Sequence, residues 1–439
     1  MEVKTFQGGA HIPHYKSYTE DKPITRLSPP KEVIIPLLQC LGEPCEPLVK
    51  EGDRVKIGQK IGDSEEMFSA PVHASISGTV KAIEKRTVPT GGEDSCIIIE
   101  ADDGPQEFEM KQVRDPDNPD LDEYRKCVRE GGLVGMGGAA LPTHVQTKYN
   151  EKVDTLLLNG AECEPFLTCD HRIMVEKAEE LVKGAELKMK SIGAKRTLFG
   201  IEVNKPDAIE AISELIKDRD DMEVVPLAVK YPQGFKSHLI KAATGRDVPR
   251  GARSAELGCI VRNVGTTIAA YEAYVYDKPM IERVVTVSGP KVAKPGNYVI
   301  RIGTPVSHVL NESGVEAVEN HKVVLGGPMT GLAQPHLEVP VVKSTTGVIL
   351  LPPKMTREWM EYADCVRCGK CVDYCPMALY PNHISICAEK EMFNTAEEWD
   401  LMDCIECGIC SYVCPASRPI VHWIQRAKPE IKKLQRSRK

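Results

Sequence analysis

Short apolar runs, separated by glycine and proline, dominate the pattern at the start of the chain. Val55, Ile57 and Ile61 are spaced as they would be on short β-strands, and Gly52 supplies a turn before them. The pattern therefore predicts a small domain of β-strands over residues 1–115.

The pattern changes after a linker at 106–121, which is rich in Asp, Pro and Asn. Strand and helix signals then alternate, in the order strand Asp154–Leu158, helix Ile173–Ile192, strand Arg196–Ile201, helix Pro206–Lys217 and strand Met222–Val229. Because strands and helices that alternate at this spacing form layers, we expect an α/β domain with a largely parallel sheet.

A second β-rich stretch runs from Ile281 to Leu351, and helices are expected over Thr356–Ala427. No apolar run approaches the roughly 18–20 residues that a bilayer crossing needs, and the start of the chain does not resemble a signal peptide. We therefore expect neither secretion nor membrane spanning, while peripheral attachment stays open. The tail Arg426–Lys439 is strongly basic, which suits either a solvated end or contact with anionic lipid or an acidic partner.

Composition narrows the class of protein. A chain of 439 residues with 42% hydrophobic and 27% charged residues indicates a globular protein of two to four domains. The net charge of −7 argues against nucleic acid as the main partner. Sixteen cysteines without a signal peptide indicate reduced thiols, some of them metal ligands, rather than a disulfide framework.

Two cysteine runs near the end of the chain carry the strongest chemical signal. Both follow C-x2-C-x2-C-x3-C-P, a spacing typical of proteins with two [4Fe-4S] clusters, in which the fourth cysteine of each run ligates the other cluster. We therefore assign one cluster to Cys365, Cys368, Cys371 and Cys414, and the other to Cys404, Cys407, Cys410 and Cys375. The alternative is structural zinc, which requires neither the third cysteine at this gap nor the proline that follows each run.

A glycine-rich loop, Gly131–Tyr149, precedes the first strand of the α/β region. Glycines let a backbone lie against a ligand, and amides at the start of a helix favour an anion. Asn159, Glu162 and Glu164 follow the strand that ends at Leu158. Because ligands of open α/β sheets bind at the carboxyl ends of strands, the loop and these polar residues are predicted to form one crevice.

The loop sequence GMGGAALPT resembles the flavin loop of the NADH-oxidising subunit of respiratory complex I, and NGAECEPF and RNVGTT resemble motifs that follow it there. The order of all parts resembles the C subunits of Rnf electron-transport complexes. This resemblance implies a multidomain α/β fold with additional β and all-α parts: a barrel-sandwich hybrid similar to biotinyl/lipoyl domains (1–115), a Rossmann-like FMN/NADH domain (120–278), a ubiquitin-like, SLBB-type β-grasp domain (280–352), a helical ferredoxin-like domain with two [4Fe-4S] clusters (355–427) and a basic tail (428–439).

The same resemblance implies roles for individual residues. Gly135, Gly137, Gly138 and Ala139 would line FMN, Lys148 would reach its phosphate, Asn159, Glu162 and Glu164 would face the isoalloxazine or the nicotinamide, and Asn263 and Thr266 would bind the flavin phosphate or ribityl chain. Three residues depart from the family pattern. Leu141 replaces an aromatic residue that stacks on the nicotinamide, and Phe235 and Lys236 stand where acidic residues accept hydrogen bonds from ribose hydroxyls. These departures put the affinity for NADH in question.

The resemblance implies the NADH/NAD⁺-facing subunit of a ferredoxin:NAD⁺ oxidoreductase that couples electron transfer to Na⁺ or H⁺ movement. Such a subunit would lie peripherally on the cytoplasmic face of a membrane complex and contact its other subunits. It needs no catalytic acid or base, because a flavin converts the hydride of NADH into single electrons for the clusters. Two alternatives stay open: a soluble flavo-iron–sulfur reductase similar to cobalamin reductases, and an electron-transfer or docking module that binds no nucleotide.

Overall fold

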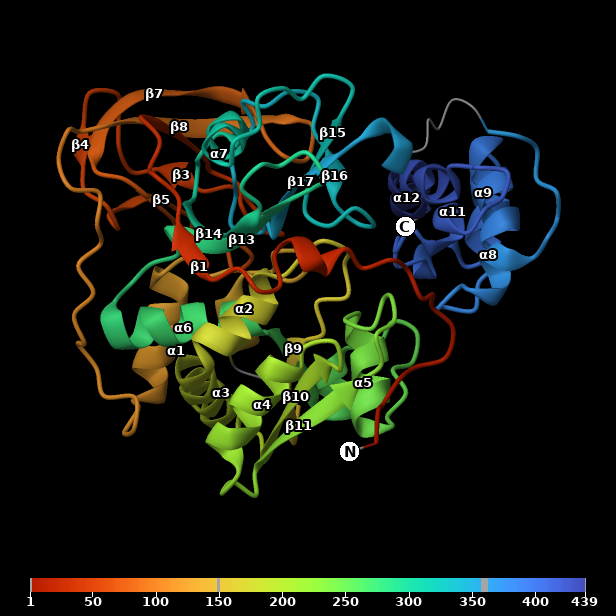
Figure 1. The fold of residues 1–439 in the computed structure, drawn as a ribbon, viewed down its shortest axis with the longest axis horizontal. Helices are drawn as coiled ribbons and strands as arrows, with labels where there is room; N and C mark the ends of the chain where they lie inside the picture. Colours follow the sequence, from red (N-terminus) through yellow and green to blue (C-terminus); the bar gives the residue numbers. More distant parts are fainter. Residues whose placement is uncertain (1, 148–150, 357–361, 439) are drawn as a thin grey trace.

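The computed structural model describes residues 2–147, 151–356 and 362–438. The described residues form four β-sheets with flanking helices, and the C-terminal helices make a separate lobe to one side of them (Figure 1). This arrangement confirms the expected mixture of α/β, β and all-helical parts.

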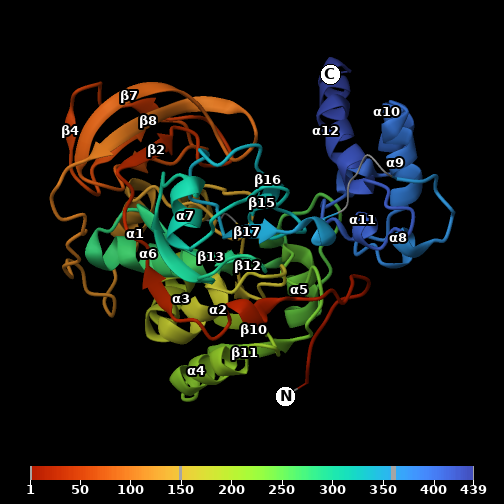
Figure 2. The same ribbon diagram turned by 45° about the horizontal axis from the view of Figure 1, so that its top comes forward.

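Two small antiparallel sheets near the N-terminus face each other and form the barrel-sandwich part. One sheet has the order β2 (Glu32–Pro36), β8 (Glu93–Ala101), β7 (Gly78–Thr87) and β4 (Arg54–Val55), and the other has the order β3 (Glu46–Pro47), β5 (Lys60–Asp63) and β6 (Val72–His73). Their shared core is made of fully buried aliphatic side chains such as Val33, Ile61 and Ile97. Figure 2 shows these strands above the α/β domain, at the upper left.

The α/β domain contains a parallel four-stranded sheet, as its alternating pattern predicts. Its strand order is β11 (Met222–Leu227), β10 (Arg196–Glu202), β9 (Thr155–Gly160) and β12 (Cys259–Asn263). The accompanying helices are α1 (Leu121–Glu130), α2 (Cys169–Glu176), α3 (Ala178–Ile192), α4 (Pro206–Ile216), α5 (Lys236–Thr244) and α6 (Val264–Tyr276).

The prediction of one helix over Ile173–Ile192 is wrong, because the chain forms two helices there. The backbone leaves helical geometry at Lys177 (φ −127°, ψ 34°). Both helices pack against α4 and α6, with α3 lying mainly against α6. In addition, α2 begins at Cys169, where the Glu162 carboxylate accepts hydrogen bonds from backbone amides of its first turn.

The β-grasp part is a mixed six-stranded sheet with one helix, α7 (Val306–Glu312). Its strand order is β1 (Ile24–Arg26), β14 (Gly296–Arg301), β13 (Glu282–Ser288), β17 (Gly347–Leu351), β15 (Lys322–Leu325) and β16 (Leu332–Ala333). Strand β1 pairs in parallel with β14, so this early segment lies in the β-grasp sheet and outside the two barrel-sandwich sheets.

Residues 2–20, here called the N-terminal strap, run across the α/β domain towards the helical lobe (Figure 1). Lys4 forms a parallel bridge with Leu227 at the edge of the sheet, and Ala10 pairs with Tyr231. The backbone amide of Gly9 donates to the Tyr374 carbonyl of the lobe at 3.1 Å. The strap therefore ties the α/β domain to the cysteine-bearing lobe.

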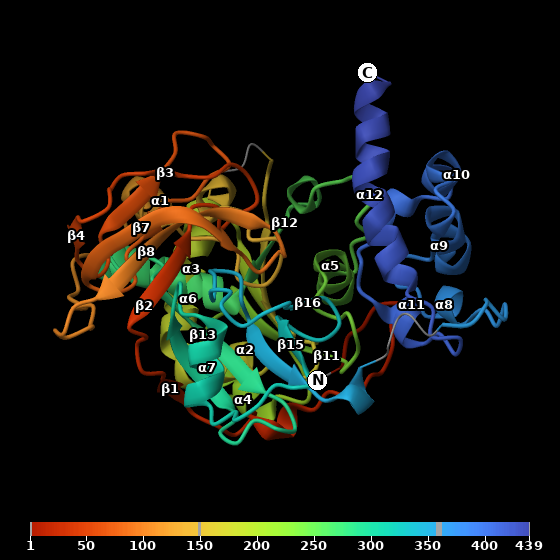
Figure 3. The same cartoon turned by 90° about the horizontal axis from the view of Figure 1, so that it is seen from above.

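The helical lobe carries both cysteine runs on short helices and the loops between them. Its helices are α8 (Lys370–Asp373), α9 (Pro381–Glu389), α10 (Phe393–Glu398), α11 (Ile409–Tyr412) and α12 (Ile420–Ser437). Figure 3 shows α12 extending away from the other domains. The remaining short elements are 3₁₀ turns at Lys16–Tyr18, Thr143–Gln146, Ser254–Leu257, Pro353–Met355 and Leu401–Asp403. Within the described ranges, no helix combines the length and apolar character that a bilayer crossing requires.

Candidate cofactor site

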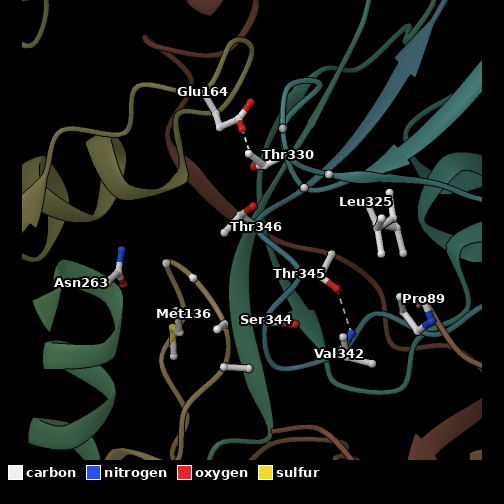
Figure 4. A pocket seen from close by; sticks show the side chains of 18 of the residues that line it. Pro89, Met136, Glu164, Asn263, Leu325, Thr330, Val342, Ser344, Thr345 and Thr346 are labelled. Atoms are coloured by element: carbon white, nitrogen blue, oxygen red, sulfur yellow. Dashed lines mark hydrogen bonds between the residues drawn. The ribbon is translucent and has the colours of Figure 1, made fainter. Parts of the chain in front are cut away.

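A cavity of about 760 Å³ opens where all parts of the chain meet. Its walls include the glycine loop (136–140), the carboxyl end of β9 with the residues that follow it (159–164), two loops of the β-grasp sheet (325–332 and 342–346), two barrel-sandwich segments (38–41 and 88–90), and Ile405 and Cys407 of the helical lobe. Figure 4 shows Met136 and Asn263 on the side opposite Pro89, with Thr345 and Thr346 between them. The volume lies in the range of small-molecule and cofactor sites.

The glycine loop lies directly against the start of α6. Gly137, Gly138 and Ala139 line the cavity, and a Cβ atom on Gly137 would stand only 3.0 Å from Asn263 Nδ2. Thr266 is fully buried, and its hydroxyl oxygen accepts a hydrogen bond from the Met136 amide at 2.9 Å. Thr266 thus anchors the loop from behind. Neither Thr266 nor Gly135 is among the lining residues, and Lys148 lies outside the described residues.

Asn159 at the carboxyl end of β9, and Glu162 and Glu164 just after it, line the cavity, as expected for the carboxyl end of a parallel strand. Asn159 Nδ2 donates to the Gly234 carbonyl at 2.8 Å. The Glu162 carboxylate caps α2 by accepting from the amides of Asp170 and His171 at 2.7 and 3.2 Å.

Glu164 has a different environment, because it is turned towards the β-grasp loop. It accepts hydrogen bonds from the Met329 amide at 3.0 Å and from the Thr330 hydroxyl, a contact drawn in Figure 4. Burial raises the pKa of Glu164, although these hydrogen bonds oppose the rise. Glu164 therefore joins two domains at the cavity wall.

Asn263 and Asp170 form a pair beneath the glycine loop. Asn263 is the N-cap of α6 and accepts from the Thr266 amide at 3.1 Å. Its Nδ2 donates to Asp170 Oδ2 at 2.6 Å, and both residues line the cavity. Asp170 was not among the candidate site residues predicted from the sequence. Its position shortly after Asn159, Glu162 and Glu164 was the signal that it faces the same crevice.

Of the three residues that depart from the family pattern, only Phe235 lines the cavity. Lys236 is exposed and is the first residue of α5. Leu141 is partly buried, and its carbonyl accepts from the Gly135 amide at 2.9 Å, which closes the glycine loop.

The eight cysteines of the two runs surround two smaller cavities in the helical lobe. One is lined by Cys365, Cys368, Cys371 and Cys414, and the other by Cys375, Cys404, Cys407 and Cys410. In each cavity, three thiols come from one run and the fourth comes from the other. Left-handed residues occur at equivalent places in both runs, at Arg367 and Gly369 and at Glu406 and Gly408, where they curl the backbone around the cavity. Four thiols around an enclosed space fit the donor set of a [4Fe-4S] cubane.

The second of these cavities borders the large one, because Cys407 lines both. The Tyr231 hydroxyl donates to the Cys407 carbonyl at 2.9 Å and lies 3.4 Å from Glu164 Oε1. A Cβ atom on Gly408 would stand 2.9 Å from the Met329 carbonyl, so the loop of the second run is pressed against the β-grasp domain. The first cavity shares no lining residue with the large one, and Cys368 at its edge is exposed.

Comparison with protein families gives four matches that together cover most of the chain. Residues 4–104 match the RnfC barrel sandwich hybrid domain, residues 128–272 the Nuo51 FMN-binding domain, residues 284–333 the SLBB domain and residues 357–415 the 4Fe-4S dicluster domain.

Among curated proteins, similarity extends over nearly the full length. The chain is 42% identical to the C subunit of the Na⁺-translocating ferredoxin:NAD⁺ oxidoreductase complex of Acetobacterium woodii, over 98% of each chain. It is 41% identical to the proton-translocating counterpart of Clostridium ljungdahlii, over 98% of this chain and 94% of that one. A solved NAD⁺-reducing [NiFe]-hydrogenase structure shares the fold at 20% identity and a TM-score of 0.50, over 72% of this chain and 64% of that one.

Proposed function

Because the chain belongs to the family of C subunits of ion-translocating ferredoxin:NAD⁺ oxidoreductases, we propose that it passes electrons between NAD(H), FMN and two [4Fe-4S] clusters. The observation that carries this proposal is the shared wall at Cys407, which joins the large cavity to the second cysteine cavity. A flavin in the large cavity would therefore lie beside an iron–sulfur cluster, as electron transfer between them requires.

FMN fits the large cavity through the residues that line it. Gly137, Gly138 and Ala139 leave the loop backbone open to a flat ring, and Asn159 and Asn263 bring amide groups to the same wall. Gly135 and Thr266 do not line the cavity, but they shape and anchor the glycine loop. When bound, FMN would supply the conversion between a hydride and two single electrons. The chain itself positions the ring.

The dinucleotide is proposed to enter beside Phe235. This side chain lines the cavity and would supply an aromatic ring there, in place of the aromatic residue that the family carries at Leu141. Lys236 stands at the start of α5, where its charge and the helix amides favour an anionic group such as a pyrophosphate. Lys236 cannot accept hydrogen bonds from a ribose diol, so phosphate contacts would carry more of the affinity.

The two cysteine cavities are proposed to hold the clusters, with the fourth thiol of each set crossing from the other run. The set of Cys404, Cys407, Cys410 and Cys375 would be the cluster next to the flavin. The set of Cys365, Cys368, Cys371 and Cys414 would exchange electrons with a partner, because its edge is exposed at Cys368 and at Val366, which is 65% exposed.

The chain is a subunit of a larger complex in this family, and we propose peripheral attachment on the cytoplasmic side of the membrane. The A. woodii relative is named for Na⁺ and the C. ljungdahlii relative for protons, so coupling to either ion occurs among close relatives. Ion movement itself would belong to partner subunits.

Cofactor analysis combined with a redox assay tests the proposal. Anaerobically purified protein should contain about eight iron atoms and about eight labile sulfides, and it should bind FMN. The FMN-loaded protein should reduce ferricyanide with NADH. Cluster absorbance without flavin binding would favour the module that binds no nucleotide. An active protein that does not sediment with membranes at low salt would favour the soluble reductase.

A further inference from the structure

Asp170 occupies a position that none of the proposed cofactor contacts uses. Its carboxyl is almost entirely buried and lines the large cavity. Asn263 Nδ2 holds Oδ2 at 2.6 Å, and a Cβ atom on Gly265 would stand 3.6 Å from Oδ1. Gly137 packs on the same Asn263 amide from the cavity side. The carboxyl therefore lies just beneath the loop on which the flavin is proposed to rest.

Charged groups from several elements face this carboxyl. Glu162 lies on the segment after β9, Arg283 on β13 and Lys205 before α4. Arg283 donates to the Lys343 carbonyl, and Lys205 donates to the Ala161 carbonyl and to Glu202. Both cations are thus shared with other acceptors, whereas Glu162 is held next to Asp170 by its bond to the Asp170 amide.

These surroundings disfavour a charge on Asp170. Burial raises the pKa of the Asp170 carboxyl to about 7, and the neighbouring Glu162 carboxylate adds to the rise. The carboxyl is therefore protonated below neutral pH and charged above it. A further negative charge in the cavity would raise this pKa again.

We propose that Asp170 is a proton acceptor of the flavin cavity and takes up one proton when a flavin bound there is reduced, an inference that rests on the proposed function. When bound, FMN would accept a hydride, two electrons and one proton, from NADH: the nicotinamide C–H bond would break, the hydrogen would bond to the flavin, and NAD⁺ would leave. This transfer would add one negative charge to the cavity. A second proton comes from solvent and binds the Asp170 carboxylate, which balances that charge. Transfer of the two electrons to the clusters releases both protons.

The test is the pH dependence of the flavin reduction potential, measured spectroelectrochemically on anaerobic, FMN-loaded protein between pH 7 and pH 9. In this range Asp170 is charged while the flavin is oxidised, so its protonation adds to the proton carried by the flavin. The unmodified protein should show the slope of two protons per two electrons. Asp170→Asn should show the slope of one proton, so that its potential lies above that of the unmodified protein by a margin that grows from pH 7 to pH 9.

Asp207→Asn is the matched control, because Asp207 holds His171 from the partly exposed side and does not line the cavity. It should keep the two-proton slope. A one-proton slope in the unmodified protein, or equal slopes in Asp170→Asn and the unmodified protein, would overturn the inference. A one-proton slope of the unmodified protein would overturn the inference even if Asp170→Asn fails to retain FMN. Failure of the proposed function itself would appear separately, as absence of FMN binding or of flavin bleaching by NADH.

Discussion

The two cysteine cavities take all their thiols from residues between 365 and 414, whereas the large cavity takes its walls from segments between residues 36 and 407. The first arrangement depends on spacing within two short runs and on their mutual packing. The second depends on contacts between domains that lie far apart in sequence. A cluster site can thus be encoded locally, while the cavity next to it exists only when every domain is in place.

The largest effect is expected from a variant that tests whether the fourth thiol of each cluster comes from the other cysteine run. Cys375 belongs to the first run but lines the cavity of the second. Cys375→Ser should therefore abolish the cluster beside the flavin and lower iron and sulfide content by about half. Iron and sulfide analysis of anaerobic protein gives the measurement. Cys387→Ser is the control, because Cys387 is buried in α9 outside both cysteine cavities and should leave the iron content unchanged. Full iron in Cys375→Ser would contradict the assignment.

Replacing a residue that does not line the large cavity should affect that cavity nearly as strongly. Lys16 of the N-terminal strap is fully buried, and its Nζ donates to the carbonyls of Glu162, Glu164 and Leu167 at 2.8, 3.1 and 2.5 Å. Lys16→Met leaves three carbonyls without this donor. The free energy of unfolding should therefore fall by roughly 4 kcal/mol, and FMN should bind more weakly. Denaturant unfolding and FMN titration measure both effects.

Lys4→Met provides a control within the same strap. Lys4 pairs with the exposed Glu2 at the surface, so its replacement should change stability by less than about 1 kcal/mol. Equal losses in the two variants would show that the strap does not act through the buried ammonium.

The same contrast explains what the sequence could reveal. The cysteine spacing predicted which thiols would lie together, and the apolar strand ending at Leu158 predicted that Asn159, Glu162 and Glu164 would reach one crevice. Both signals are local.

Other features depend on tertiary packing and left no such signal. The contact of Tyr231 with Cys407 and the anchoring of Glu164 by Met329 and Thr330 each join two domains. The helix break at Lys177 likewise left no local signal, because the residues around it favour a continuous helix.

A buried charge cluster joins three strands of the β-grasp sheet to the segment that follows α6. Glu282 on β13 contacts Arg26, Lys278 and Arg301 at 2.6, 3.0 and 2.7 Å. Burial alone would raise the pKa of Glu282, but the hydrogen bond from Arg26 and the charges of Lys278 and Arg301 lower it to about 2. Glu282→Gln should therefore cost about 3 kcal/mol of stability at neutral pH.

The pH dependence has a definite sign. Because the folded-state pKa of Glu282 lies below the ordinary 4.5, its stabilisation is complete above pH 4.5 and is lost as the pH falls towards 2. Urea unfolding should show the difference between Glu282→Gln and the unmodified protein shrinking over that range. Glu32→Gln, which breaks an exposed pair with Lys81, should cost less than about 1 kcal/mol. A constant difference at all pH values would contradict the ionic origin.

The smallest effect is expected at the boundary between the two kinds of site. Tyr231→Phe removes the hydroxyl that donates to the Cys407 carbonyl, and a single such bond stabilises a fold by about 1 kcal/mol. Tyr298→Phe removes a similar bond to the Lys294 carbonyl within the β-grasp domain, away from both cavities. Both variants should lose similar stability, but only Tyr231→Phe should slow electron transfer from flavin to cluster, by roughly fivefold if the lost bond loosens docking by that energy. Stopped-flow absorbance after mixing with NADH separates flavin reduction from the later electron transfer to the cluster. Equal rates of that transfer in the two variants would mean that the Tyr231 hydroxyl stabilises the fold without holding the cluster loop against the flavin cavity.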